Sequence, residues 1–297
     1  MRHGTYSIVA LDPETGELGA AVQSHWFSVG SLCTWARPGV GAVATQSVVE
    51  PAHGPNALDR LEAGEPAGEA LRALLGADPL AAVRQVGIVD ARGEVAVHSG
   101  PYCIPHAGDA TGPHWSCQAN MMERDTVPAA MSAAFGAATG DLAARLLATL
   151  QAAEGEGGDV RGRQSAALLV VPPEGEAWRA RVDLRVEDHE NPLAELERLL
   201  GLWRAYELAG AADELMAAER PEEAGALYRR AAELAPDSDE LLFWAGLAIA
   251  HAGELDEGIA AIRRAAERQP NWLVLLDRLS PDFAPAGTAV RAAIGRG

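Results

Sequence analysis

The chain contains no lysine, so all 24 of its basic side chains are arginine, and 42 acidic residues outnumber them. The missing lysine excludes a lysine base, a lysine Schiff base and the lysine of a phosphate-binding P-loop. The formal net charge of −18 repels nucleic-acid backbones and anionic lipid surfaces. We therefore expect neither nucleic acid nor a membrane among the partners.

Cysteine and long apolar runs are also scarce. Three cysteines are too few and too irregularly spaced for a disulfide framework or a zinc ribbon. His98, His106 and His114 recur at intervals of eight, which is not a helical metal spacing. No run of about 18 apolar residues occurs, and the N-terminus lacks a signal-peptide pattern. These absences predict a cytoplasmic protein with no metal and no other cofactor.

Two parts of the chain differ in pattern, and the predicted domains are residues 1–190 and 191–297. In the first part, apolar segments joined by turn residues predict β-hairpins over residues 5–24, 85–100 and 166–186, and a further strand over 40–46. Paired helical stretches lie between these segments. Hairpins alternating with helix pairs indicate an α+β fold of antiparallel or mixed sheets covered by helices.

The second part repeats itself. Residues 222–238 and 256–272 superimpose at an offset of 34, with "RRAAE" and then proline in both. This period is typical of the tetratricopeptide repeat, a pair of helices that buries its apolar face only by stacking on neighbours. About two repeats are fewer than independent stability needs. We therefore expect this all-α helical-repeat domain to dock on the first domain, on a second copy in a homodimer, or on a partner peptide.

Polar residues that begin or end apolar strands are the first candidates for chemistry. Thr5 begins the first expected strand, while Ser24 and His25 end the second. A third strand placed beside this hairpin would bring Thr45 and Gln46 to the same edge. The alternative is that these strand ends carry polar residues only because they meet water.

Two further polar segments supply candidates. Gln118 and Asn120 lie in a turn-rich block over residues 102–122, where their amides could stabilise a developing oxyanion or only satisfy buried backbone groups. Arg161, Arg163 and Gln164 stand before an apolar strand. Paired arginines there could capture a substrate carboxylate or form an internal salt bridge.

Six segments in order, among them "TYSIVALDPETGELGAAVQS", "CQANMM" and "RGRQSAALLVV", resemble the bacterial family called domain of unknown function 1028 over roughly residues 4–190. That family is placed in the N-terminal nucleophile hydrolase superfamily. The resemblance implies a four-layer αββα sandwich of two antiparallel sheets between helical layers. In that superfamily the first residue of the mature chain attacks an amide carbonyl, and its own α-amino group acts as the base.

The resemblance implies Thr5 as nucleophile and base, Ser24 and His25 as positioning and proton-handling groups, and Asn120 as the oxyanion donor. The expected substrate-binding residues are Thr45, Gln46, Gln118, Arg163 and Gln164. The expected function is hydrolysis of a small amide, with a carboxylate-bearing substrate. His25 stands where the family commonly has lysine, which lowers the expected pKa at that position by several units.

The residues before Thr5 also depart from the family pattern. Many members expose their threonine by losing the initiator methionine, whereas Met-Arg-His-Gly precedes Thr5 here and Arg2 blocks that reaction. The nucleophile then requires self-cleavage between Gly4 and Thr5, or a different translation start. The alternative function is a catalytically silent scaffold whose helical repeats mediate dimerisation or bind a partner.

Overall fold

The computed structural model describes residues 4–295, which divide into a mixed α+β unit up to Arg198 and a helical unit from Leu199. The division falls inside helix α6 (Pro192–Ala217). Each unit is described by itself below. Of the four residues that precede Thr5, only Gly4 lies among the described residues.

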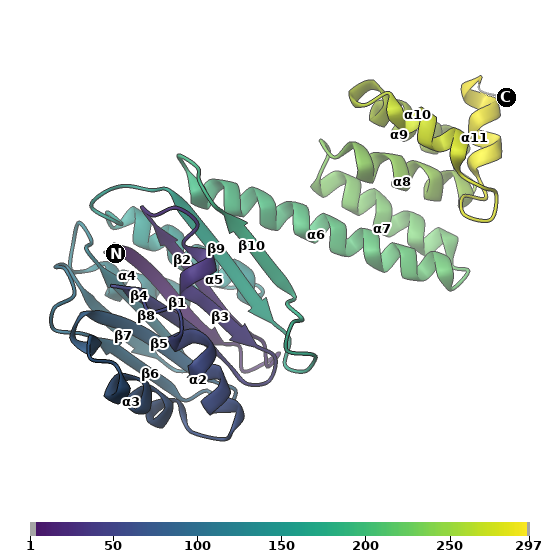
Figure 1. The fold of residues 1–297 in the computed structure, drawn as a ribbon. Coiled ribbons are helices and arrows are strands. Elements are labelled where there is room, and N and C mark those ends of the chain that lie inside the picture. Colours follow the sequence, from purple (N-terminus) through teal and green to yellow (C-terminus); the bar gives the residue numbers. More distant parts are fainter. Residues whose placement is uncertain (1–3, 296–297) are drawn as a thin grey trace. The chain divides into compact units, whose positions relative to one another are not determined.

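Two antiparallel sheets form the centre of the first unit (Figure 1). The six-stranded sheet has the order β10-β9-β2-β1-β8-β7, and the four-stranded sheet has the order β3-β4-β5-β6. The strands of the first sheet are β1 (Thr5–Leu11), β2 (Leu18–Ser24), β7 (Gly108–Gly112), β8 (Trp115–Asn120), β9 (Ser165–Val171) and β10 (Val182–Val186). Those of the second are β3 (Thr34–Arg37), β4 (Gly41–Ser47), β5 (Arg84–Asp90) and β6 (Val95–Ser99).

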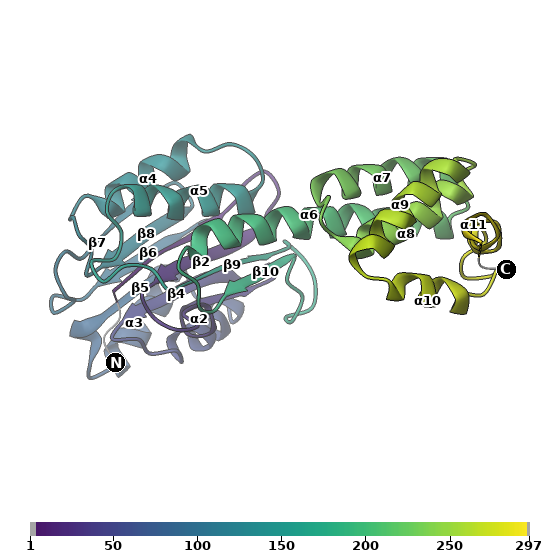
Figure 2. The same cartoon turned by 90° about the horizontal axis from the view of Figure 1, so that it is seen from above.

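Helices cover the outer face of each sheet. The pair α4 (Val127–Ala137) and α5 (Leu142–Gly155) packs on the six-stranded sheet, and the pair α2 (His53–Glu62) and α3 (Ala67–Ala77) packs on the four-stranded sheet. Figure 2 shows the two pairs on opposite sides of the sheets. The short helix α1 (Gly30–Cys33) joins β2 to β3, and the 3-10 turn η1 (Ala81–Val83) lies between α3 and β5. The order of layers in this unit is therefore helix, sheet, sheet, helix.

The three expected hairpins are confirmed by the pairing of β1 with β2, β5 with β6 and β9 with β10. The placement of the strand that ends in Thr45 and Gln46 was wrong. Strand β4 belongs to the other sheet and faces the first hairpin rather than extending it. The block over residues 102–122 was also misread, because it contains the paired strands β7 and β8. Polar side chains buried on β8 hide the apolar alternation that marks a strand.

The space between the sheets changes from polar to apolar along β1. Successive side chains of a strand point to opposite faces. Val9 and Leu11 accordingly pack with apolar residues of the second sheet, while Ser7 donates a hydrogen bond to Gln46 Oε1 on β4 at 2.6 Å. On the opposite face of β1, the Tyr6 hydroxyl donates to Glu154 of α5 at 2.7 Å. The polar end of the intersheet space is thus the end at which β1 begins with Thr5.

The helical unit contains the C-terminal part of α6 and five further helices. These are α7 (Pro221–Leu234), α8 (Asp239–His251), α9 (Leu255–Arg268), α10 (Asn271–Arg278) and α11 (Gly287–Ile294). Helices α7 and α9 are both 14 residues long and begin 34 residues apart. No helix among residues 4–295 is both long enough and apolar enough to span a membrane.

Helices α8 and α9 approach so closely that their contact requires glycine. A Cβ on Gly258 would lie 2.4 Å from the carbonyl oxygen of Gly246 and 2.7 Å from the Cβ of Ala250. Backbone atoms cannot yield as a flexible side chain can. We expect Gly258→Ala to lower the free energy of unfolding by about 1–3 kcal/mol, measured by urea denaturation. Gly201→Ala is the control, because nothing lies within 4 Å of its Cβ position; an equal loss there would contradict this account.

A buried ionic cluster connects α2 and α3 to β5. The side chain of Asp78 is 7% exposed and accepts hydrogen bonds from Arg84 Nε at 2.7 Å and from His53 Nε2 at 3.0 Å. Burial by itself raises the pKa of Asp78, but the hydrogen bonds from Arg84, the Leu80 N–H and His53 lower it to about 2. The charged carboxylate is therefore the stable form in the folded protein.

We expect Asp78→Ala to destabilise the protein by roughly 3 kcal/mol at pH 7, since it leaves the buried Arg84 guanidinium poorly paired. The folded pKa lies below the unfolded value of about 3.9, so the stabilisation is complete above that value and is lost as pH falls through about 2. Urea titrations at pH 7 and pH 2.5 measure this. Asp59→Ala removes a 66% exposed carboxylate and serves as the control; equal effects would refute the cluster's role.

Candidate functional site

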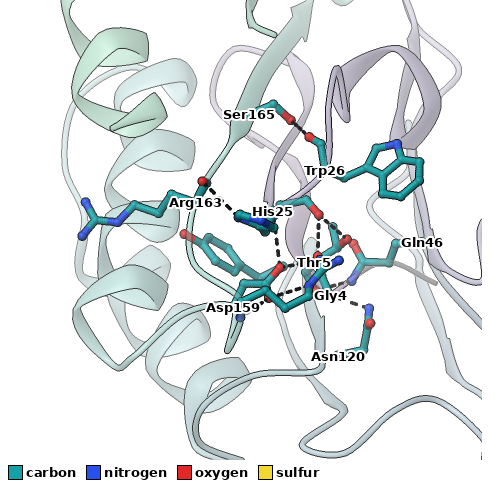
Figure 3. Close-up of polar contacts among 12 residues, drawn as sticks. Gly4, Thr5, His25, Trp26, Gln46, Asn120, Asp159, Arg163 and Ser165 are labelled. Carbon is teal, nitrogen blue, oxygen red and sulfur yellow. Dashed lines mark hydrogen bonds and ion pairs between the residues drawn. The ribbon is translucent and has the colours of Figure 1, made fainter. Parts of the chain in front are cut away.

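Thr5 lies in the middle of the six-stranded sheet, at the end of β1 where three strands meet. It is opposite Ser24 of β2 on one side and Asn120 of β8 on the other. Its side chain is fully buried and donates a hydrogen bond to Ser24 Oγ at 3.1 Å. The first residue of β1 therefore presents its hydroxyl to a second hydroxyl inside the protein. Figure 3 shows Thr5 among the polar residues that surround it.

The carbonyl oxygen of Gly4 receives two side-chain hydrogen bonds. Ser24 Oγ donates one, and Arg161 Nη2 donates the other at 2.8 Å. Ser24 thus accepts a hydrogen bond from the Thr5 hydroxyl and donates one to the carbonyl that precedes Thr5. Two donors that converge on one amide oxygen form the arrangement that stabilises negative charge when a nucleophile attacks the adjacent carbon.

A buried carboxylate holds Arg161 in this position. Asp159 has a fully buried side chain and forms an ion pair with Arg161 at 2.8 Å, and it also accepts from the Arg161 and His25 backbone N–H groups. The same carboxylate lies against Gly4, where an added Cβ would be 2.8 Å from both of its oxygens. The residue before Thr5 consequently has to be glycine unless Asp159 moves.

Side-chain amides from both sheets, Gln46 of β4 and Asn120 of β8, hold the carbonyl of Thr5. Gln46 Nε2 donates to the Thr5 carbonyl oxygen at 3.2 Å, and Asn120 Nδ2 reaches it at 3.4 Å. Both amides also donate to Gln85 Oε1, at 2.8 and 3.0 Å. Asn120 Oδ1 is buried and has no hydrogen-bond partner among residues 4–295. The network fixes the Thr5 backbone and leaves one acceptor unsatisfied beside it.

The structure brings Thr5, Ser24, Gln46 and Asn120 together, but it places the other expected site residues elsewhere. The Arg163 side chain points away from Thr5 (Figure 3) and forms an ion pair with Glu154 at 2.8 Å. The side chains of the remaining residues have these contacts: His25 Nδ1 with the Arg163 carbonyl oxygen, Thr45 with the Glu50 carbonyl oxygen, Gln118 with Ser7 and Ser116, and Gln164 with Asp188.

Gln85 and Asp159, which contact this amide network and Gly4, were not among the candidates, and Arg161 was a candidate only for capture of a substrate carboxylate. Gln85 lies within a strand segment that reads as ordinary sheet, so nothing in the sequence marks it. Asp159 and Arg161 stand two residues apart in the "GGDVRGR" loop. The available signal in the sequence was an acid two residues before an arginine in a glycine-rich loop. Such a pair is costly to bury without a specific role, so it marks a candidate site.

Other reactive groups are poor candidates for chemistry. Cys33, Cys103 and Cys117 are buried free thiols. Burial raises the pKa of Cys33 to about 12 and raises that of Cys117 as well, so both stay protonated at neutral pH and are weak nucleophiles. Among residues 4–295, no group of three or more histidine, cysteine or acidic residues could hold a metal ion.

The first unit is thus a mixed α+β domain of two antiparallel sheets between helices, and a helical region follows it in the sequence. At one end of the six-stranded sheet, Thr5 lies beside two donors that bind the Gly4 carbonyl oxygen. The chain belongs to the family of unknown function DUF1028, whose family model matches residues 5–196.

A solved relative supports this assignment. The crystal structure of protein SPO2555 from Silicibacter pomeroyi, also matched to DUF1028, is 32% identical to this chain with a TM-score of 0.61, and the match covers 66% of this chain and 88% of that one. None of the curated proteins matches the chain.

Proposed function

We propose that the protein is an amide hydrolase of the N-terminal nucleophile type, which generates its own nucleophile by cleaving the bond between Gly4 and Thr5. The observation that carries the proposal is the convergence of Ser24 Oγ and Arg161 Nη2 on the Gly4 carbonyl oxygen, with the Thr5 hydroxyl bound to the same Ser24. The helix, sheet, sheet, helix order of the first unit agrees with the four-layer sandwich of that superfamily.

The cleavage proceeds through an ester. Thr5 Oγ bonds to the Gly4 carbonyl carbon, the C–N bond breaks, and the amide nitrogen takes the hydroxyl proton, so that Gly4 becomes esterified to Thr5 and the α-amine is free. Water then hydrolyses the ester and releases the Gly4 carboxylate. Ser24 and Arg161 hold the negative charge that develops on the carbonyl oxygen, which is the main source of catalysis in such reactions.

The same groups serve the substrate after cleavage. Departure of Gly4 leaves the Ser24 hydroxyl and the Arg161 guanidinium without their carbonyl, and a substrate acyl oxygen takes that place. The substrate reacts in the same two steps, amide to Thr5 ester and ester to acid. Ser24 and Arg161 thereby take the oxyanion-binding role expected of Asn120, while Arg163, expected to bind substrate, pairs with Glu154. Asn120 positions Thr5 and offers its unpartnered oxygen to a substrate N–H.

The freed α-amine supplies the base that the lysine-free sequence lacks. An α-amine titrates at about 8, so a large share is neutral near physiological pH and can accept the proton of the Thr5 hydroxyl. The side chain of Thr5 and its own amine thus form a minimal catalytic pair.

An electrophilic probe tests the proposal directly. An epoxyketone forms a ring only with a residue that carries both a free α-amine and a β-hydroxyl, so the processed protein should gain one probe mass located on Thr5 by peptide mapping. Thr5→Ala should gain none. Absence of labelling in a protein whose N-terminus has been shown to be Thr5 would overturn the hydrolase assignment.

A scaffold function is the second candidate. The hydrogen bonds from Ser24 and Arg161 to the Gly4 carbonyl oxygen would also serve to hold an uncleaved chain in place before β1. If the bond between Gly4 and Thr5 is never cleaved, the first unit is silent, and the helical region, whose 34-residue spacing agrees with tetratricopeptide-like repeats, carries the function through dimerisation or partner binding.

A further inference from the structure

The helical unit contains a cavity of about 540 Å³, which we call the aromatic pocket. It lies among α6, α7, α8 and the segment before α11, and its volume falls in the range of small-molecule sites, about 300–1,000 Å³. The walls include four aromatic side chains: Tyr206, Tyr228, Trp244 and Phe283. We propose that the aromatic pocket binds a small organic cation, an alkylated or quaternary ammonium compound. This inference does not depend on the chemistry at Thr5.

The aromatic walls form a corner with an open side. Trp244 and Phe283 meet edge to face, with their ring centroids 6.0 Å apart at an angle of 66°. Phe283 is nevertheless 70% exposed and Tyr206 is 42% exposed. Exposed aromatic rings around a cavity are costly unless they cover a ligand, and ring faces attract cations through their negative quadrupole.

Carboxylates dominate the charge of the pocket. Two of them, Asp213 and Glu240, line it together with the imidazole of His251, and no arginine among residues 4–295 does. Tyr228 donates its hydroxyl proton to Asp213, and Tyr206 donates to Glu240 Oε2 at 2.6 Å. Burial raises the pKa of Tyr228, as does the nearby Asp213, so this hydroxyl remains a donor. Each carboxylate is therefore held at the wall of the pocket by a tyrosine hydroxyl.

The aromatic walls and the two carboxylates together indicate which class of ligand fits the pocket. An anion would meet two carboxylates, and a neutral apolar molecule would leave them without a counter-charge. A strongly hydrated cation would gain little from aromatic walls, whereas alkyl groups on nitrogen spread the charge and lower the cost of desolvation. An alkylated ammonium group satisfies the rings and the carboxylates together.

Calorimetric titration of the full chain with choline and with its neutral isostere 3,3-dimethylbutan-1-ol tests the proposal. Choline should bind at least about 10-fold more tightly. The double variant Asp213→Asn, Glu240→Gln should reduce choline affinity about 10-fold or more and leave the isostere unaffected. The matched control Glu207→Gln, Glu214→Gln removes the same charge from α6 outside the pocket and should bind like the wild type.

Three results would overturn the proposal. These are equal affinity for choline and its isostere, equal weakening in the two double variants, and absence of choline binding by a chain that unfolds cooperatively. The last titration uses a peptide that carries trimethyllysine in place of choline. Tighter binding of that peptide than of choline would overturn the assignment to a free small molecule.

Discussion

Replacing Thr5 with alanine is expected to leave a folded chain that keeps Gly4 joined to residue 5 and has no amide hydrolase activity. The substitution removes the only side-chain oxygen of the residue that we propose as nucleophile. Loss of an attacking group costs several orders of magnitude in rate, at least about 1,000-fold. The effect on folding should be small, because the Thr5 side chain makes one described hydrogen bond, to Ser24, worth about 1 kcal/mol.

Thr5→Ser provides the control for this variant. Serine keeps the hydroxyl and lacks only the methyl group, so cleavage and hydrolysis should continue at a lower rate. Mass spectrometry of the purified chains, together with thermal unfolding, separates loss of the nucleophile from loss of the fold. Cleavage of Thr5→Ala at the same bond and with the same rate as the wild type would contradict the assigned role of Thr5.

Arg161→Ala is expected to slow cleavage between Gly4 and Thr5 by about 100-fold, the usual effect of removing one donor to a developing oxyanion. Its guanidinium donates to the Gly4 carbonyl oxygen at 2.8 Å. The variant also leaves the buried Asp159 carboxylate without its ion pair. Arg161→Gln, which keeps an N–H donor without the charge, should recover part of the rate if hydrogen bonding to the carbonyl is what matters.

Arg163→Ala is the matched control, since it removes the same type of side chain two residues along the same loop. Arg163 binds Glu154 and Asn191 on the surface, and no described contact joins it to Gly4. Its cleavage rate should remain close to that of the wild type. Cleavage that is slowed by Arg163→Ala and not by Arg161→Ala would show that the carbonyl-binding groups have been misassigned.

The difference between these two arginines shows where prediction from sequence ended. The "RGR" pattern over residues 161–163 indicated that arginines stand at the entrance of a strand, but not which one points inward. Asp159 accepts from the Arg161 backbone N–H and binds its side chain, and Gly162 has φ +100°, a left-handed conformation that turns the chain. Arg163 therefore leaves on the other side. Such a reversal depends on a buried contact that spacing does not encode.

Local turn chemistry, by contrast, was sufficient for the pairing of Thr5 with Ser24. The segment "DPETGE" forms the turn of a hairpin, and once its position is known the register of the two strands follows, with Thr5 opposite Ser24. Gln46 was expected beside these residues in the same sheet, but it reaches the Thr5 carbonyl across the intersheet space. Periodicity gives the face of a strand, not the sheet to which the strand belongs.

Strand β8 escaped detection for a different reason. Ser116, Gln118 and Asn120 point toward the second sheet, where apolar side chains are the usual occupants. Their burial is possible because they have polar partners. Asn120 donates to Gln85 of β5, and Gln118 donates to Ser7 of β1, which donates to Gln46 of β4. Buried polar groups with partners are tolerated inside proteins. A polar pattern therefore concealed a central strand, and that strand carries part of the candidate site.

The mass of the intact protein, followed over time after purification, tests the central claim most directly. The account predicts that the wild-type chain loses the residues before Thr5 and that sequencing of the new N-terminus begins Thr-Tyr-Ser, whereas Thr5→Ala retains Gly4. A wild-type chain that unfolds cooperatively yet still carries Met-Arg-His-Gly, with no shorter species at any time, would contradict the account and leave Ser24 and Arg161 as structural partners of an uncleaved carbonyl.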